Sequence, residues 1–145
     1  MPERPPSPLS PRPGEPGPEP FGGARVLVVD DNAVFAKATA ALLASLGATA
    51  DVTSDGFAAL SALAQTPYAL VLLDWEMPGL DGRRTAFEIR RRHGPSPPIV
   101  IISARASGAL RPFGPEGGVD GVLGKPFTRA ELAATLGRWL RATPR

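Results

Sequence analysis

The apolar positions of this chain fall into short continuous runs separated by longer stretches of mixed polarity. The strongest runs are ARVLVVD (24–30), YALVLLD (68–74) and PPIVIIS (97–103), with weaker ones at ATADVT (48–53) and VDGVLG (119–124). Short apolar runs bounded by turn residues are typical of strands that are buried on both faces. Such strands belong to parallel sheets covered by helices on both sides. We therefore expect five parallel strands.

The stretches between the runs carry apolar residues near helical spacing, which predicts helices at 32–47, 55–65, 81–94 and 128–142. The side chains that we expect to face the sheet are Phe35, Leu42, Leu43, Leu46, Phe57, Leu60, Leu63, Phe87, Ile89, Leu132, Leu136, Trp139 and Leu140. Residues 104–118 should supply a fifth helix, but four glycines and two prolines predict a short or irregular one.

The alternation of strand and helix predicts an α/β fold with a doubly wound, five-stranded parallel sheet. Residues 1–23 stand apart, because they hold nine of the eighteen prolines and almost no apolar side chain to bury. We predict a disordered Pro-rich tail at 1–23 and one domain at 24–145.

Composition narrows the class of protein. The chain has no cysteine, which excludes a disulfide framework and a thiolate metal site. No apolar run approaches a membrane span, and the N-terminus lacks the pattern of a secretion signal. A formal charge of +2 gives no indication of a nucleic-acid partner. We expect a cytoplasmic protein that acts without membrane or nucleic acid.

Polar side chains follow the strands where each one ends. Asp30 and Asp31 follow the first strand, and Asp74 ends the third. Ligands of open parallel sheets bind outside the carboxyl ends of the strands. Three carboxylates crowded there repel one another unless a cation lies among them, and Mg²⁺ prefers such oxygen ligands. We predict a magnesium site formed by Asp30, Asp31 and Asp74, with the backbone carbonyl of Glu76 as a further ligand.

A carboxylate beside Mg²⁺ can also attack phosphorus. Ser103 ends the fourth strand and Lys125 follows the fifth, so both could bind the phosphoryl oxygens. Lys125 is one of two lysines against fourteen arginines, and its compact, movable charge suits this role. Each residue also has a simpler interpretation. The Asp30–Asp31 pair could cap a helix, Ser103 could bond to backbone, and Lys125 could be a solvated loop cation.

Four motifs in this order resemble the receiver domain of two-component response regulators, over about residues 24–142. They are VLVVDDN (26–32), LVLLDWEMPGLDG (70–82), IVIISA (99–104) and GKPF (124–127). The resemblance implies a flavodoxin-like (βα)5 fold with strand order 2-1-3-4-5 and a cis Lys125–Pro126 bond.

The resemblance also implies a function. Asp74 would accept a phosphoryl group from a histidine of a kinase or phosphotransfer protein, and the acyl phosphate would later hydrolyse. Asp30 and Asp31 would hold Mg²⁺, and Ser103 and Lys125 would bind phosphoryl oxygens. The domain would be a signalling module, not an enzyme acting on external substrates.

This sequence departs from the family at Val122, where an aromatic residue often stands three positions before the lysine. Two other functions remain open: a pseudo-receiver that binds partners without phosphorylation, and a small Mg²⁺-dependent aspartyl phosphatase.

We also expect Glu76 to pair with Arg105 and slow dephosphorylation. Arg90, Arg91 and Arg92 should form a solvated face, and His93 should be exposed.

Overall fold

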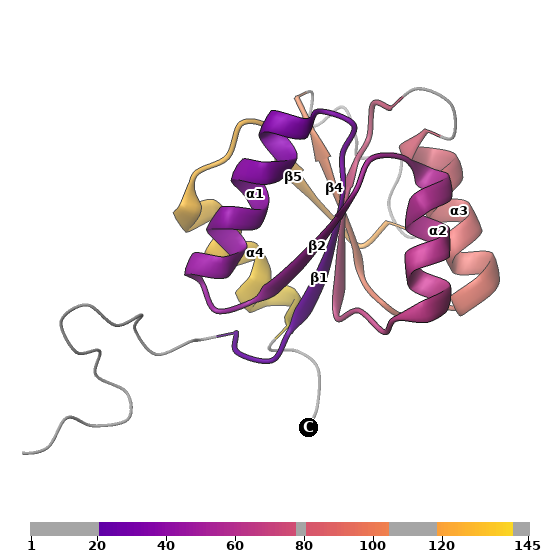
Figure 1. Ribbon diagram of the computed structural model, residues 1–145, viewed down its shortest axis with the longest axis horizontal. Coiled ribbons are helices and arrows are strands. Elements are labelled where there is room, and N and C mark those ends of the chain that lie inside the picture. The colour runs from indigo at the N-terminus through magenta and orange to yellow at the C-terminus, as the bar shows by residue number, and fades with distance from the viewer. Residues whose placement is uncertain (1–20, 78–80, 105–118, 141–145) are drawn as a thin grey trace, which may run out of the picture.

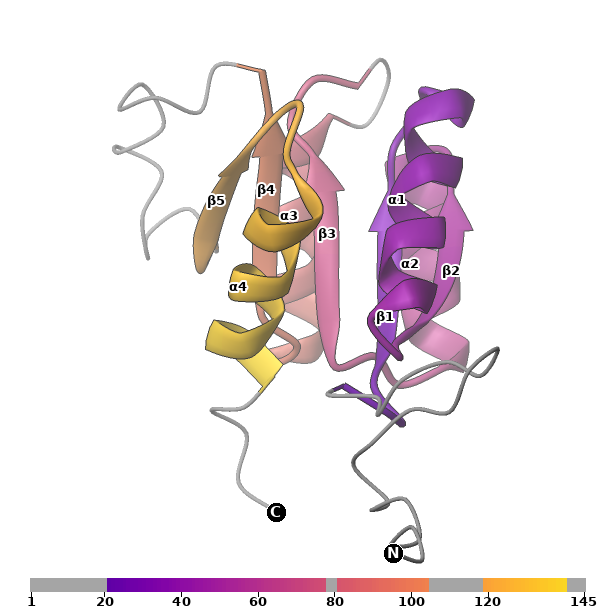
Figure 2. The ribbon, with the colours of Figure 1, turned by 90° about the vertical axis from the view of Figure 1, so that its left-hand side faces the viewer.

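The computed structural model describes residues 21–77, 81–104 and 119–140. Its centre is a parallel sheet with the order β2-β1-β3-β4-β5, as expected. Figure 2 shows the strands side by side in this order. The strands are β1 (Arg25–Val29), β2 (Thr49–Thr53), β3 (Leu70–Asp74), β4 (Ile99–Ser103) and β5 (Gly121–Gly124). All five lie within the predicted apolar runs. The central strands β1, β3 and β4 are buried along nearly their whole length, whereas the edge strand β2 has no buried residue and β5 has one.

Helices cover both faces of the sheet (Figure 1). They are α1 (Ala33–Ser45), α2 (Gly56–Gln65), α3 (Gly82–His93) and α4 (Arg129–Leu140). One core lies under α1 and α4 and takes alternate strand residues such as Val28, Leu72 and Ile102. The other lies under α2 and α3 and takes the residues between them, such as Val29 and Leu73. The fold is therefore the doubly wound α/β arrangement predicted from the apolar runs.

Side-chain caps fix where three helices begin. Asn32, Asp55 and Asp81 each accept a hydrogen bond from the backbone N–H three residues later, at 2.7–3.0 Å. These caps begin α1, α2 and α3 at the carboxyl edge of the sheet. Residues 30 and 31 consequently lie in the short loop between β1 and the first turn of α1.

Two side chains expected in the core are exposed. Phe57 is 66% exposed and Phe87 is 59% exposed. Ile89 is fully buried, and residues two apart on a helix point in nearly opposite directions, so Phe87 cannot share its face. On α2 the buried stripe runs through Gly56, Ala59, Leu60 and Leu63, which leaves Phe57 on its flank. The expectations for Phe57 and Phe87 were wrong.

Arg90 is not part of a solvated basic face, in contrast to our expectation. Its guanidinium donates to the carbonyls of Gly94 and Pro97 at 3.2 and 2.9 Å, and to the Asp120 carboxylate at 2.6 Å. Asp120 also accepts from Ile99 N at 2.8 Å. Arg90 therefore ties the end of α3 to the beginnings of β4 and β5. Arg91, Arg92 and His93 are exposed, as expected.

Phe21 belongs to the folded part of the chain, although we placed it in the Pro-rich tail. Its side chain is 7% exposed and lies in the core shared with α1 and α4. Its carbonyl accepts from Ala24 N at 3.1 Å, so the chain turns directly into β1. Residues 1–20 of the predicted tail lie outside the described residues.

The expected fifth helix was placed at 104–118, and all of this range except Ala104 also lies outside the described part of the chain. Within the described ranges, no helix combines the length and apolar character that a membrane span requires. The Lys125–Pro126 peptide bond is cis, as the resemblance implied.

Candidate phosphoacceptor and metal site

Strand register brings the predicted site residues to one edge of the sheet. Val29 of β1 pairs with Leu73 of β3, so the next residues, Asp30 and Asp74, emerge side by side. Asp74 in turn pairs with Ile102, one residue before Ser103. Ser103 pairs with Gly124, which immediately precedes Lys125. Four neighbouring strands therefore deliver the polar side chains that the sequence placed at their ends.

Three carboxylates gather at this edge. One ligand oxygen from each of Asp30, Asp31 and Asp74 lies within 4.8 Å of the other two. Asp30 and Asp74 are each 3% exposed, whereas Asp31 is exposed to solvent. Asp30 Oδ1 accepts from Asn32 N at 2.9 Å, which fixes the loop before α1. We call Asp30, Asp31 and Asp74 the carboxylate cluster.

Lys125 lies beside the two buried members of the cluster. Its Nζ is 3.4 Å from Asp30 Oδ2 and 3.8 Å from Asp74 Oδ2. Lys125 N also donates to Ser103 O at 3.0 Å, which continues the pairing of β4 and β5 past the strand ends. The ammonium therefore neutralises part of the negative charge of the cluster without reaching close hydrogen-bond distance.

The pKa of Asp74 is raised to about 7. Burial is the main cause, and the neighbouring Asp30 charge raises it further. Lys125 and the hydrogen bond from Glu76 N oppose the rise, since both favour the ionised form. Burial and the Asp30 charge therefore disfavour the ionised form of Asp74 more than Lys125 and Glu76 N favour it.

Glu76 contacts two of the predicted site residues. Its backbone N–H donates to Asp74 Oδ1 at 3.2 Å. Its side chain accepts from the buried Ser103 hydroxyl, with Ser103 Oγ 3.0 Å from Glu76 Oε2. Glu76 thus places a fourth carboxylate beside the cluster. The pair that we expected between Glu76 and Arg105 cannot be described, because Arg105 lies outside the described residues.

Two residues near the site were missed by the sequence analysis. Gly82 lies against the end of β3, where an added Cβ would be 2.8 Å from both Asp74 O and Trp75 Cα. Its position directly after Asp81 in the sequence motif that ends with LDG was the available signal. Phe35 was assigned only to the core, yet its ring centroid is 4.3 Å from Lys125 Nζ. No pattern in the sequence indicates this contact, because it joins α1 to the loop after β5.

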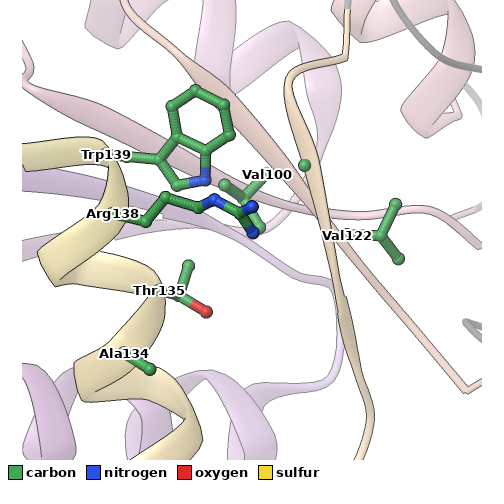
Figure 3. Close-up of a pocket in the computed structure, with 7 residues that line it drawn as sticks. Val100, Val122, Ala134, Thr135, Arg138 and Trp139 are labelled. Atoms are coloured by element: carbon green, nitrogen blue, oxygen red, sulfur yellow. The ribbon is translucent and has the colours of Figure 1, made fainter. Parts of the chain in front are cut away.

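A separate hollow of about 120 Å³ lies between β5 and α4 (Figure 3). Figure 3 shows Trp139, Arg138 and Thr135 reaching from α4 toward the strand that carries Val122. An added Cβ at Gly121 would be 3.0 Å from Trp139 Nε1, so glycine lets the indole pack on β5. Val100 and Gly121 lie near the beginnings of β4 and β5, so the hollow contains no residue of the carboxylate cluster.

The family model described as the response regulator receiver domain matches residues 26–137. The chain belongs to this family. Among curated relatives, it is 37% identical over 119 residues to the sensor histidine kinase GacS of Pseudomonas protegens. That match covers 79% of this chain and 13% of GacS. A match to the transcriptional regulatory protein TcrA of Mycobacterium tuberculosis is 35% identical and covers 84% of this chain and 48% of TcrA. The chain thus spans about half of TcrA and far less of GacS.

Solved receiver domains share the fold. The receiver domain of the sensor histidine kinase PA1611 from Pseudomonas aeruginosa, solved with a magnesium ion in its active-site cleft, is 35% identical with a TM-score of 0.75. The match covers 83% of this chain and 99% of that domain. The response regulator TrrA of Thermotoga maritima, solved in complex with Mg²⁺-BeF, is 29% identical with a TM-score of 0.71. That match covers 80% of this chain and 98% of TrrA.

Proposed function

We propose that this receiver domain is a phosphoacceptor in which Asp74 takes a phosphoryl group in a Mg²⁺-dependent reaction. The observation that carries the proposal is the convergence of Asp30, Asp31, Asp74 and Lys125 at one edge of the sheet. Three carboxylates and one ammonium suit a metal-assisted transfer of a negatively charged group better than they suit any purely structural role.

The carboxylate cluster fits magnesium. Its oxygens come from three residues and lie within reach of one ion, and carboxylates are ligands that Mg²⁺ prefers. Burial, and after it the charge of Asp30, raises the pKa of Asp74, and a divalent cation at the cluster would oppose this rise. Asp30, Asp31 and Asp74 would hold the ion, with the Glu76 carbonyl as a further ligand. When bound, Mg²⁺ would supply positive charge to the phosphoryl oxygens.

The chain's own residues have distinct roles in this proposal. A carboxylate oxygen of Asp74 attacks phosphorus, the new O–P bond forms, and the N–P bond to the donor histidine breaks. Lys125 binds one phosphoryl oxygen as a point charge. Ser103 donates its hydroxyl to another oxygen. Later hydrolysis of the acyl phosphate returns Asp74 to its free form.

The partner in this proposal is a histidine kinase or a histidine phosphotransfer protein. Relatives include both sensor kinases and transcriptional regulators, so the domain could receive phosphate within a relay or as a separate regulator. We further propose that the receiver domain extends to residue 145 and that its folded part begins at Phe21, after a Pro-rich tail at 1–20. In this scheme it acts in the cytoplasm, without binding nucleic acid or membrane, and turns over no external substrate.

Intact mass measurement tests the proposal. The full chain is incubated with acetyl phosphate and Mg²⁺, with the Asp74→Asn variant as the matched control. We expect one added phosphoryl group on the wild-type chain, none on the variant, and none in EDTA. No addition to folded wild-type protein would overturn the proposal and favour the pseudo-receiver. Repeated turnover of a small phosphate ester would instead favour the aspartyl phosphatase.

A further inference from the structure

Phe35 and Lys125 meet at the edge of the carboxylate cluster, although 90 residues separate them in the sequence. Phe35 lies in the first turn of α1, and Lys125 follows β5. Lys125 Nζ is 4.3 Å from the Phe35 ring centroid. This distance is within the range over which a ring face attracts an ammonium ion. The ring therefore belongs to the immediate surroundings of the ammonium.

The position of the Phe35 ring is itself fixed. Phe127 packs against it in a T-shaped arrangement, with ring centroids 5.3 Å apart and planes at 84°. Both rings are half-buried and pack on the core beneath α1 and α4. Aromatic pairs prefer such an arrangement, so Phe127 holds the ring from the same loop that carries Lys125. The contact thus joins α1 to the loop between β5 and α4.

We propose that Phe35 is a positioning residue whose ring holds the Lys125 ammonium where a phosphoryl group on Asp74 would be bound. This inference rests on the proposed function of Asp74. Lysine has a flexible stem, and the distances from Nζ to Asp30 and Asp74, 3.4 and 3.8 Å, exceed those of strong charge-assisted hydrogen bonds. The long hydrogen bond to Asp30 and the ion pair with Asp74 therefore leave a role for the ring in holding the ammonium.

Magnesium makes the ring more important. A divalent cation held by Asp30, Asp31 and Asp74 would compete with Lys125 for the Asp30 and Asp74 carboxylates, and it would repel the ammonium. An aromatic ring is not a ligand for Mg²⁺. The Phe35 ring would therefore still attract the Lys125 ammonium when Mg²⁺ is bound. The ring contact should therefore affect phosphoryl transfer in the magnesium-loaded protein more than it affects magnesium binding.

The experiment compares Phe35→Leu with Phe35→Tyr in the full chain. The first variant removes the aromatic face and keeps an apolar side chain, whereas the second keeps the face. The phosphorylation rate is measured with acetyl phosphate at saturating Mg²⁺, and Mg²⁺ affinity is measured by isothermal titration calorimetry. We expect Phe35→Leu to slow phosphorylation roughly three- to tenfold. Phe35→Tyr should keep the wild-type rate to within about twofold. Mg²⁺ affinity should change less than about twofold in either variant.

Several outcomes would overturn this role. An unchanged rate in Phe35→Leu would show that the ring does not position Lys125. Equal losses in both variants, or a parallel loss of Mg²⁺ affinity, would show that Phe35 acts only through packing. If Phe35→Leu fails to fold, the phosphorylation rate is measured on a chain with pentafluorophenylalanine at position 35. This residue keeps the shape of the ring and reverses the electrostatic potential of its face. A wild-type rate there would reject the proposal, and a slowed rate would support it.

The Asp74→Asn control separates this inference from the proposed function. If the wild-type chain is phosphorylated, Asp74→Asn is not, and Phe35→Leu equals wild type, the positioning role fails while the phosphoacceptor proposal stands. If the folded wild-type chain is not phosphorylated, both fail together.

Discussion

Ser103 Oγ donates a hydrogen bond of 3.0 Å to Glu76 Oε2. The hydroxyl proposed to bind a phosphoryl oxygen is therefore engaged with a carboxylate from the loop after β3. A serine hydroxyl has one proton to donate, so it must leave this acceptor before it can donate to a phosphoryl group.

We predict that Glu76→Ala accelerates phosphorylation by acetyl phosphate roughly three- to tenfold, because it removes the carboxylate that accepts the Ser103 hydroxyl. Glu76→Gln should give a smaller increase, since the amide oxygen can still accept the Ser103 hydroxyl. Glu88→Ala, which removes a carboxylate from α3, serves as the control and should leave the rate unchanged. A slower or unchanged rate in Glu76→Ala would contradict the prediction.

The raised pKa of Asp74 predicts a pH dependence of stability in the absence of metal. The folded-state pKa is about 7 against a reference value of 3.8, so the folded state holds this proton more tightly than the unfolded state does. The contribution of this group to stability is therefore present at low pH and is lost as pH rises from about 4 to about 7.

Asp74→Asn removes this cost of ionisation. In EDTA we expect the variant to exceed wild type in free energy of unfolding by about 1–3 kcal/mol at pH 8, and by much less at pH 5. Urea denaturation at the two pH values measures the difference. Asp55→Asn, which keeps an N-cap acceptor on α2, is the control. An equal effect of Asp74→Asn at both pH values would show that the pKa of Asp74 is not raised.

Gly82 leaves no room for a side chain beside the end of β3. An added Cβ would be 2.8 Å from Asp74 O and Trp75 Cα, and backbone atoms cannot move aside as a flexible side chain can. We expect Gly82→Ala to lower the free energy of unfolding by about 1–3 kcal/mol and to weaken Mg²⁺ binding. Arg84→Ala, at an exposed position two residues later, should leave both unchanged. A fully stable Gly82→Ala variant with normal Mg²⁺ affinity would show that this packing does not constrain the site.

Phe21 and Phe57 form a matched pair, since the same residue is 7% exposed at one position and 66% exposed at the other. We expect Phe21→Ala to destabilise the fold by about 2–4 kcal/mol, because it leaves a cavity in the core beneath α1. Phe57→Ala should change stability by less than about 0.5 kcal/mol. Thermal or urea unfolding of both variants tests the assignment. Equal losses would contradict it.

The sequence determined the sheet and the residues at its carboxyl edge. Strands buried on both faces need apolar side chains at nearly every position, so runs such as LVLLD (70–74) are visible without any tertiary information. Parallel strands bring their carboxyl ends to one edge, so Asp30, Asp74 and Lys125 were expected to converge before their distances were known. The order of the strands came from the family resemblance, since apolar pattern alone does not rank strands in a sheet.

Tertiary structure decided the contacts that depend on how a helix is rotated or on which loops meet. Helical spacing suggested that Phe57 and Phe87 were buried, but packing against the sheet selected neighbouring stripes instead. Arg90 lies in a basic run, yet the beginnings of β4 and β5 supply its acceptors. The pairs Ser103–Glu76 and Phe35–Lys125 join residues 27 and 90 positions apart. Such contacts leave no periodic signal, because they arise only when separate loops fold onto the same edge of the sheet.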